Sequence, residues 1–251
     1  MSDKPTARVA LVTGAARGLG RAIAEALVGQ GTTVFLVDIL AERLEDTRSA
    51  LADGGAKCAA FPTDIAVRTN CIAAVDAAIA TFGRLDILIN AAGLMRFNHA
   101  VDVPEEEFSH IMQVNAAAPF WFCQAALPHL IASEGNIVNV LSQSALMGTS
   151  YIVPYAMSKA ALLQLTKSLA VEYVDAPIRV NAVAPGAMMT EISSEAKFPE
   201  GIDFAKMKRY SGERPPADPA EVAAVVAFIS SPVASGVHGA VWTADGGVTA
   251  G

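Results

Sequence analysis

Short apolar runs alternate with longer segments of helical periodicity along most of the chain. The runs are rich in β-branched residues and apolar on both faces, a pattern typical of strands buried in a parallel sheet. They cover Val9–Thr13, Thr33–Val37, Lys57–Phe61, Leu85–Ile89, Asn136–Leu141, Ile178–Val183 and Ala240–Thr243. Between them, apolar side chains recur at helical spacing, as at Leu19, Ile23, Ala26 and Leu27.

This order of elements predicts an α/β fold. We expect one domain over residues 1–251, a doubly wound Rossmann fold with a mostly parallel sheet and helices on both faces. The segment at about 186–217 is the least regular, because it combines several prolines with many apolar side chains. Such a segment is typical of a loop that closes over a ligand, so we expect a substrate lid there.

Composition and charge narrow the classes of partner. Apolar residues make up 53% of the chain and charged residues 17%, which argues against disorder. The net charge of −7 repels phosphate backbones and anionic lipid, so we expect neither nucleic acid nor a membrane as partner. The three cysteines form no paired motif, the N-terminus has no apolar signal region, and the histidines lack metal-ligand spacing. A cytoplasmic protein without a metal site is the expectation.

Three glycines stand between the first predicted strand and the first predicted helix. Gly14, Gly18 and Gly20 would let the backbone turn tightly and approach a pyrophosphate, which the N-terminus of the helix then binds through free N–H groups. A three-glycine motif alone is weak evidence. Its position after the first strand strengthens the prediction of a dinucleotide site.

Asp38 and Arg17 favour different forms of the cofactor. Asp38 ends the second strand, where a carboxylate accepts the ribose hydroxyls of NAD and repels the 2′-phosphate of NADP. Arg17 lies beside the glycines and could pair with a phosphate, but it could also reach solvent or the pyrophosphate. We therefore expect NAD, with NADP as the less favoured alternative.

Tyr155 and Lys159 lie one helical turn apart, and Ser142 ends a buried strand thirteen residues before the tyrosine. A nearby ammonium would lower the pKa of the phenol, which could then serve as general base toward an alcohol or general acid toward a ketone. The Ser142 hydroxyl could hold the reacting oxygen. Ser144, two residues further, is expected to face the substrate.

At these residues the sequence resembles the short-chain dehydrogenase/reductase family, in its branch of about 250 residues. Motifs in the family's order span nearly the whole chain. They comprise Thr13, Gly14, Gly18, Gly20, Asp64, Ile65, Asn90, Ala91, Ala92, Gly93, Asn115, Ser142, Tyr155, Lys159, Pro185, Gly186 and Thr190. The sequence departs from the family pattern at Ala91, Leu141 and Ala145, where asparagine, serine and glycine are usual.

The resemblance implies site residues and an assembly. The implied catalytic residues are Asn115, Ser142, Tyr155 and Lys159. The implied cofactor contacts are Gly14, Arg17, Gly18, Leu19, Gly20, Asp38, Asp64, Ile65, Asn90, Ala91, Gly93, Tyr155, Lys159, Pro185, Gly186, Met188 and Thr190. The resemblance also implies a homo-oligomer, a tetramer with interfaces around residues 111–133 and 150–170.

The hypothesis that combines these features is an NAD(H)-dependent oxidoreductase that interconverts a secondary alcohol and a ketone. One alternative is an NADPH-dependent 3-oxoacyl-thioester reductase, and another is a non-catalytic dinucleotide-binding sensor. Apolar residues near the predicted site suggest an apolar small-molecule substrate. They are Leu146, Met147, Met188 and Met189, together with the aromatic residues of the expected lid.

Overall fold

The computed structural model describes residues 7–191 and 197–250, and the statements below concern that part of the chain. Seven strands form one sheet. They are β1 (Val9–Thr13), β2 (Thr33–Asp38), β3 (Cys58–Pro62), β4 (Ile87–Asn90), β5 (Asn136–Val140), β6 (Arg179–Pro185) and β7 (Val241–Ala244). The α-helices are α1 (Gly18–Gly29), α2 (Ala41–Asp53), α3 (Arg68–Phe82), α4 (Glu105–Met112), α5 (Ala118–Ala132), α6 (Val153–Glu172), α8 (Phe204–Ser211) and α9 (Pro219–Ser230).

The strands follow the order β3-β2-β1-β4-β5-β6-β7, and every pairing between neighbours is parallel. In register, Ala10 of β1 lies beside Val34 of β2 and Ile87 of β4. The chain winds outward in one direction from β1 to β3 and in the other from β4 to β7. This switch point is where an open α/β sheet binds ligands, at the carboxyl ends of the strands.

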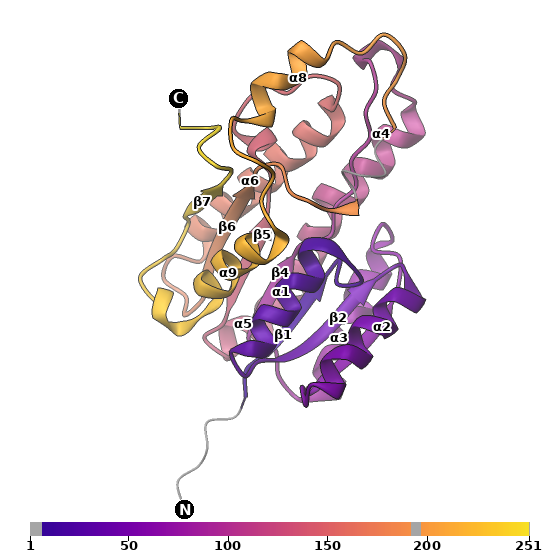
Figure 1. The fold of residues 1–251 in the computed structure, drawn as a ribbon. Helices are drawn as coiled ribbons and strands as arrows, with labels where there is room; N and C mark the ends of the chain where they lie inside the picture. Colours follow the sequence, from indigo (N-terminus) through magenta and orange to yellow (C-terminus); the bar gives the residue numbers. More distant parts are fainter. Residues whose placement is uncertain (1–6, 192–196, 251) are drawn as a thin grey trace, which may run out of the picture.

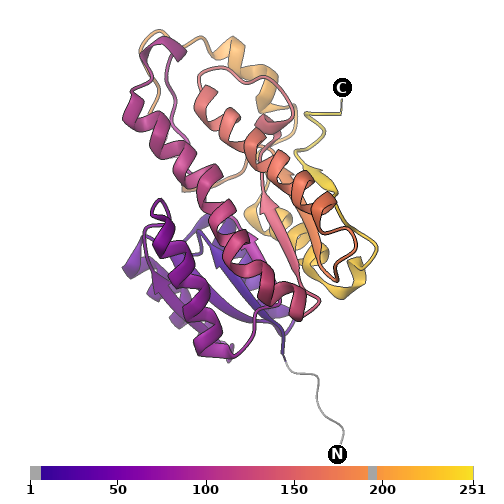
Figure 2. The ribbon, with the colours of Figure 1, turned by 180° about the vertical axis from the view of Figure 1, so that it is seen from behind.

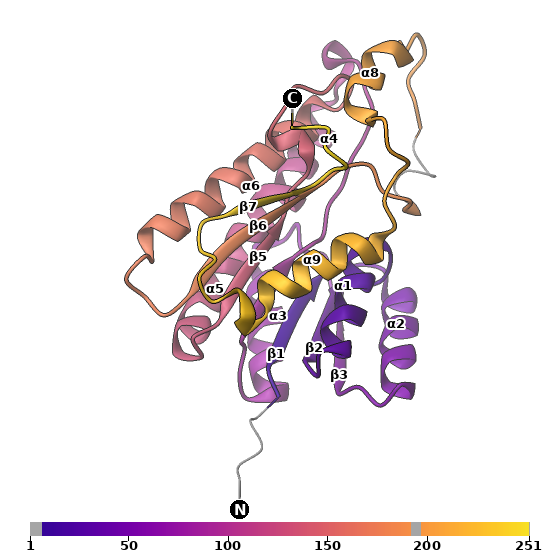
Figure 3. The same cartoon turned by 60° about the vertical axis from the view of Figure 1, so that its left-hand side comes forward.

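Helices cover both faces of the sheet (Figures 1 and 2). Helices α1, α2 and α9 pack on one face around Ile23, Leu44 and Val226, and helices α3, α5 and α6 pack on the other around Val75 and Phe122. Figure 3 separates the two layers, with α1 and α9 on one side of the strands and α5 and α6 on the other. The predicted Rossmann architecture with helices on both faces is confirmed, and the predicted strands match to within two residues.

A π-helical turn joins α4 to α5. In this turn, η2 (Gln113–Ala117), each backbone hydrogen bond encloses one residue more than in an α-helix. The Asn115 side chain within it is fully buried. Such π turns inside helices are frequent at functional sites. Short 3-10 helices complete the structure at Ala100–Asp102, Gln143–Ala145 and Pro232–Ala234.

The 186–217 segment leaves the sheet after β6 and returns before α9. Its two ends are joined, because Met189 N–H donates to the Ala217 carbonyl and Ala217 N–H donates to the Ala187 carbonyl, each over 3.0 Å. Helix α8 lies within it, above the carboxyl ends of the strands (Figure 1). Residues 192–196 of the predicted lid lie outside the described residues.

No helix in the described part of the chain is both long and apolar enough to span a bilayer.

Candidate active site

A cavity of about 1080 Å³ opens at the carboxyl ends of the strands. It collects most of the residues that the sequence predicts for the site, although they are far apart in the chain. Those lining it are Gly14, Arg17, Gly18, Leu19, Gly20, Asp38, Asp64, Ile65, Ala91, Gly93, Ser142, Tyr155, Lys159, Pro185, Gly186, Met188 and Thr190. Among the predicted site residues, Asn90 and Asn115 do not line it.

The glycine turn after β1 leaves no room for a side chain at Gly14 or at Gly20. A Cβ on Gly14 would lie 2.8 Å from the Ala92 Cα, and the residue has φ = +71°, which favours glycine. A Cβ on Gly20 would lie 2.0 Å from the Gly14 carbonyl oxygen. Thr13, the last residue of β1, joins this turn to the loop after β4. Its Oγ1 accepts hydrogen bonds from the N–H groups of Ala91 and Ala92 at 3.0 and 3.1 Å.

Helix α1 begins directly behind this turn and presents an uncapped N-terminus to the cavity. No side chain caps it and its first turn holds no acidic residue. The free N–H groups and the positive end of the helix dipole therefore face the space that Gly14, Gly18 and Gly20 leave open. This arrangement fits the pyrophosphate of a dinucleotide.

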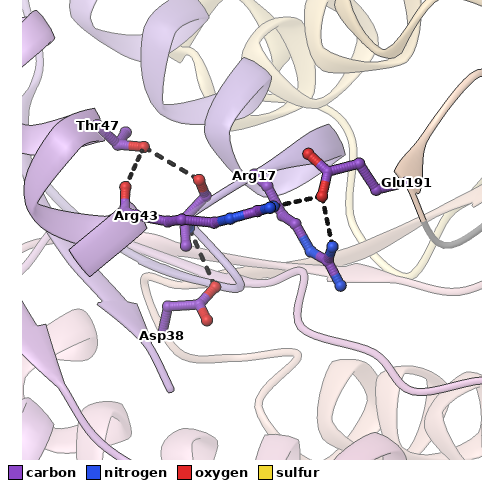
Figure 4. Close-up of polar contacts among 6 residues, drawn as sticks. Arg17, Asp38, Arg43, Thr47 and Glu191 are labelled. Carbon is purple, nitrogen blue, oxygen red and sulfur yellow. Dashed lines mark hydrogen bonds and ion pairs between the residues drawn. The ribbon is translucent and has the colours of Figure 1, made fainter. Parts of the chain in front are cut away.

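Asp38 forms the corner between β2 and the glycine turn. Its Oδ2 accepts the N–H of Ala16 at 3.0 Å and its Oδ1 accepts the N–H of Leu40 at 3.0 Å. The buried Thr47 hydroxyl of α2 donates to the Ala16 carbonyl at 3.2 Å or to the Arg43 carbonyl at 3.1 Å (Figure 4). The carboxylate keeps free lone pairs toward the cavity, so it can still accept ribose hydroxyls.

Arg17 points to a carboxylate of the 186–217 segment. Its guanidinium lies 2.5 Å from Glu191 Oε2, and Arg43 of α2 donates to the same oxygen (Figure 4). The two guanidinium groups lower the pKa of Glu191. From the sequence, the Arg17 side chain was expected to reach solvent or to bind a phosphate of the cofactor. Its pairing with Glu191 was not predicted, because nothing in the local sequence links residue 17 to residue 191.

Asp64 and Ile65 line the cavity beyond β3. Asp64 Oδ1 accepts the N–H of Ala66 at 2.9 Å, and the Asn70 side chain donates to the Asp64 carbonyl at 2.9 Å. These bonds hold the loop that follows β3 against the start of α3. The loop thereby adds a mixed polar and apolar wall beside Asp38, which suits an adenine ring.

Ser142, Tyr155 and Lys159 meet at the inner end of the cavity, as the sequence predicts. Ser142 follows β5, and its hydroxyl lies 3.0 Å from the Ser144 hydroxyl. Tyr155 and Lys159 share one face of α6, with the Lys159 Nζ 5.8 Å from the centroid of the tyrosine ring. Ser144 also lines the cavity. A hydroxyl, a phenol and an ammonium therefore face one space.

Burial changes the pKa of both ionisable groups. Burial raises the pKa of Tyr155 above its usual value, and a hydrogen bond with the Ser142 side chain only partly offsets this. Burial lowers the pKa of Lys159 to about 8. The net direction for the phenol is therefore upward, and the prediction that Lys159 lowers the pKa of the phenol stays a prediction. The ammonium donates to the Val140 carbonyl at 2.8 Å.

Asn115 lies behind this inner end. Its side chain donates to the Leu94 carbonyl at 2.8 Å and to Ser158 Oγ at 3.0 Å, and its Oδ1 accepts the Leu94 N–H at 2.8 Å. It thus ties the loop after β4 to α6. Gly93 lies between the two candidate catalytic residues, because a Cβ there would be 3.5 Å from Lys159 Nζ and 3.8 Å from Asn115 Oδ1.

Asn90 is buried behind the cavity. Its Nδ2 donates to Asn139 Oδ1 at 2.8 Å, and Asn139 in turn donates to Thr166 Oγ1 at 2.9 Å. This chain of buried amides joins β4, β5 and α6. The Asn90 amide thus points to the neighbouring strand, and the predicted cofactor contact of Asn90 stays a prediction.

The end of β6 forms the wall opposite the glycine turn. A Cβ on Gly186 would lie 2.7 Å from the Asp245 Cα and 3.0 Å from Gln143 Oε1, so only glycine fits there. The Thr190 side chain lies 3.6 Å from the Cβ position of Gly18. Pro185, Gly186, Met188 and Thr190 therefore close the cavity from the side of the 186–217 segment.

The substrate end contains residues that sequence reasoning missed. Gln143 is buried, its amide donates to the Tyr210 carbonyl, and its Oε1 has no hydrogen-bond partner among the residues that the structure describes. Tyr210 Oη donates to the Ser150 carbonyl at 3.0 Å, which holds the end of α8 over the cavity. Apolar residues form much of the remaining wall: Leu94, Met95, Phe97, Val114, Leu141 and Ile152.

The apolar residues expected near the substrate are only partly at the cavity. Met188 and the lid aromatic Tyr210 line it, whereas Leu146, Met147 and Met189 do not. Leu146 follows the short 3-10 helix after Ser142 and is 40% exposed. Met189 follows the bridge between Met188 and Ala217 in the 186–217 segment and is 62% exposed. Much of the apolar wall comes instead from the loop after β4, with Val114, Leu141 and Ile152 from other segments.

Comparisons with known proteins agree with this geometry. Residues 14–249 match the family model described as Enoyl-(Acyl carrier protein) reductase. The D-threitol dehydrogenase of Mycolicibacterium smegmatis is 35% identical over 96% of this chain and 93% of its own length. A short chain dehydrogenase from Burkholderia cenocepacia, solved in complex with NADP, superposes with a TM-score of 0.88 at 32% identity, over 98% of this chain and 99% of that one.

A second solved structure carries the other form of the cofactor. The 3-ketoacyl-(acyl-carrier-protein) reductase of Brucella melitensis, complexed with NADH, gives a TM-score of 0.87 at 30% identity, over 96% of this chain and 98% of that one. Similar folds at this level of identity thus hold either NADP or NADH.

Proposed function

The chain belongs to the short-chain dehydrogenase/reductase family of oxidoreductases acting on alcohol and ketone groups, and from this premise we propose that it is NAD(H)-dependent and uses Ser142, Tyr155 and Lys159 for catalysis. The substrate is an apolar secondary alcohol or the corresponding ketone. The single observation that carries the proposal is the meeting of these three side chains in the cavity that the glycine turn opens.

The cofactor would lie along the cavity from Asp38 to Lys159. The uncapped N-terminus of α1 would hold the pyrophosphate, and Asp38 would accept the ribose hydroxyls. The wall formed by Gly186 and Thr190 would contact the nicotinamide end. When bound, the nicotinamide supplies or accepts the hydride.

Each side chain of the trio has a defined task. Ser142 holds the reacting oxygen of the substrate by a hydrogen bond, and Tyr155 exchanges the proton with that oxygen. Burial keeps the Tyr155 phenol protonated at neutral pH, which is the form that donates to a ketone. Lys159 places a positive charge beside the phenol, so it stabilises the phenolate that is left after donation.

Asn115 is a positioning residue in this proposal. It fixes the Leu94 backbone and Ser158, which borders Lys159 on α6. The substrate would contact the apolar wall from Leu94 to Phe97, with the end of α8 as the described part of a lid. A homo-oligomer remains part of the proposal on the basis of the family resemblance, and a cytoplasmic location on the basis of the unpaired cysteines.

The experiment is turnover of a panel of secondary alcohols with NAD⁺ and NADP⁺, and of ketones with NADH and NADPH. We expect turnover with the NAD(H) pair, and Tyr155→Phe should lower kcat/KM by about 10²- to 10⁴-fold. Binding of NAD⁺ should survive, because the substitution removes only the hydroxyl. Equal turnover by wild type and Tyr155→Phe would reject the proposed mechanism.

A second candidate is an NADPH-dependent reductase of 3-oxoacyl thioesters. Arg17 and Arg43 favour it, since two guanidinium groups beside the ribose corner suit a 2′-phosphate. The same panel therefore includes a 3-oxoacyl thioester with NADPH. A non-catalytic sensor is a weaker candidate, because binding alone does not require the buried trio.

A further inference from the structure

Three charged side chains meet at the outer end of the cavity, where Arg17 and Arg43 share the Glu191 carboxylate. Arg17 is the residue before α1, Arg43 lies in the first turn of α2, and Glu191 directly follows Thr190 in the 186–217 segment. The three side chains are 30%, 50% and 44% exposed. In Figure 4, Arg43 reaches the carboxylate from the left and Arg17 from below, while Glu191 enters from the right.

The arginines are held in place by the backbone beneath them. Ala16, the residue before Arg17, donates its N–H to Asp38, and its carbonyl accepts from the Thr47 hydroxyl of α2. The same hydroxyl also reaches the Arg43 carbonyl. The pair is thus fixed next to Asp38, at the corner where a dinucleotide presents the 2′-position of its adenosine ribose.

The balance of charge at this corner depends on Glu191. Within the described residues, Arg17 and Arg43 both pair with the Glu191 carboxylate, and Asp38 lies beside them. Two neighbouring guanidinium groups are a typical phosphate-binding pair, and the Glu191 carboxylate takes the position between them that a phosphate would take. A 2′-phosphate would have to displace Glu191 from the arginines, whereas a 2′-hydroxyl needs only Asp38.

We infer that Glu191 is a specificity-determining residue: its carboxylate occupies the anion position between Arg17 and Arg43 and so excludes NADP(H) in favour of NAD(H). This inference rests on the proposed function, because it assumes that the cavity holds a dinucleotide. It explains how a chain with two arginines at the ribose corner can still select the cofactor without the phosphate. Glu191, which would select the cofactor, belongs to the 186–217 segment and not, like Asp38, to the end of β2.

The test is the affinity of the purified protein for NAD⁺ and for NADP⁺, measured by calorimetry without any alcohol or ketone. In Glu191→Gln we expect the Kd for NADP⁺ to fall about five- to tenfold, while the Kd for NAD⁺ stays within about twofold. The gain should shrink at high salt, since the groups are exposed. Adding Arg43→Gln to this variant should remove most of the gain.

Glu45→Gln is the matched control. Glu45 is an exposed acid of the same helix, α2, and pairs with Arg48 at 2.6 Å, so the substitution changes the net charge equally without touching this corner. An unchanged Kd for NADP⁺ in Glu191→Gln, or an equal gain in Glu45→Gln, would overturn the inference while leaving the proposed function intact. Failure of the wild type to bind either dinucleotide would overturn both.

Discussion

The two ends of the cavity hold ionisable groups in contrasting surroundings. At the inner end, Lys159 is buried and Tyr155 is half-buried, and the ammonium donates to the Val140 carbonyl. At the outer end, Arg17, Arg43 and Glu191 form exposed ion pairs. Burial therefore controls protonation at the inner end, whereas solvent and salt screen the charges at the outer end.

This difference separates two tasks. Proton transfer needs groups whose pKa responds to burial, and the inner end provides a phenol with a raised pKa beside an amine with a lowered one. Recognition of a cofactor needs charged side chains that can leave one partner for a group of the cofactor at a small cost in free energy. Exposed ion pairs meet this need because each contributes little to stability. The following predictions test the contrast, from the largest expected effect to the smallest.

Asn115→Leu should show how strongly the inner end depends on buried hydrogen bonds. The substitution leaves the N–H and carbonyl of Leu94 without their side-chain partner, so we expect the free energy of unfolding to fall by about 3 kcal/mol. Urea denaturation measures this. Gln113→Leu, at an exposed position of the same π turn, is the control and should change stability by less than about 0.5 kcal/mol. Similar losses in both variants would contradict the role given to Asn115.

Lys159→Met should change how stability depends on pH. The folded pKa of Lys159, about 8, lies below its ordinary value of 10.5, so the unfolded chain holds the proton more tightly. The cost of burying the ammonium is present below pH 8 and disappears as the pH rises toward 10.5. Relative to the variant, the wild type should therefore gain about 2 kcal/mol between pH 8 and pH 10.

Lys167→Met supplies the control for this pH series. Lys167 lies on the same helix but is exposed, and its ammonium donates to the Gly239 carbonyl. Its removal should leave the pH dependence of the wild type unchanged. A flat difference between wild type and Lys159→Met across this pH range would show that the ammonium is not buried as described.

Glu191→Gln should barely change the thermal stability, in contrast to the inner-end variants. The ion pairs of Glu191 are exposed, so we expect a shift in Tm of about 2 °C or less, and a smaller shift in high salt. Differential scanning calorimetry at low and high salt measures it. A much larger loss of Tm would mean that the outer end is structural, and the contrast between the ends would fail.

The sequence was sufficient for the elements and for the inner residues of the site. Apolar runs predicted the strands because the burial of both faces of a parallel sheet leaves a local signal. The spacing of Tyr155 and Lys159 predicted that they share a face because helical periodicity is also local. The position of Ser142 and Asp38 at strand ends predicted the edge of the sheet where the cavity opens.

Electrostatics and long-range contacts had to come from the tertiary structure. The pKa of Tyr155 depends on how far the assembled protein removes the phenol from water, which the spacing of residues alone does not show. The ion pair between Arg43 and Glu191 joins residues 148 positions apart, and the turn of Asn90 toward Asn139 depends on which strands become neighbours. Sequence patterns thus determined what each segment becomes, because those preferences act over a few residues. Only the packed chain decided which side chains meet, because burial and proximity arise when distant segments close on one another.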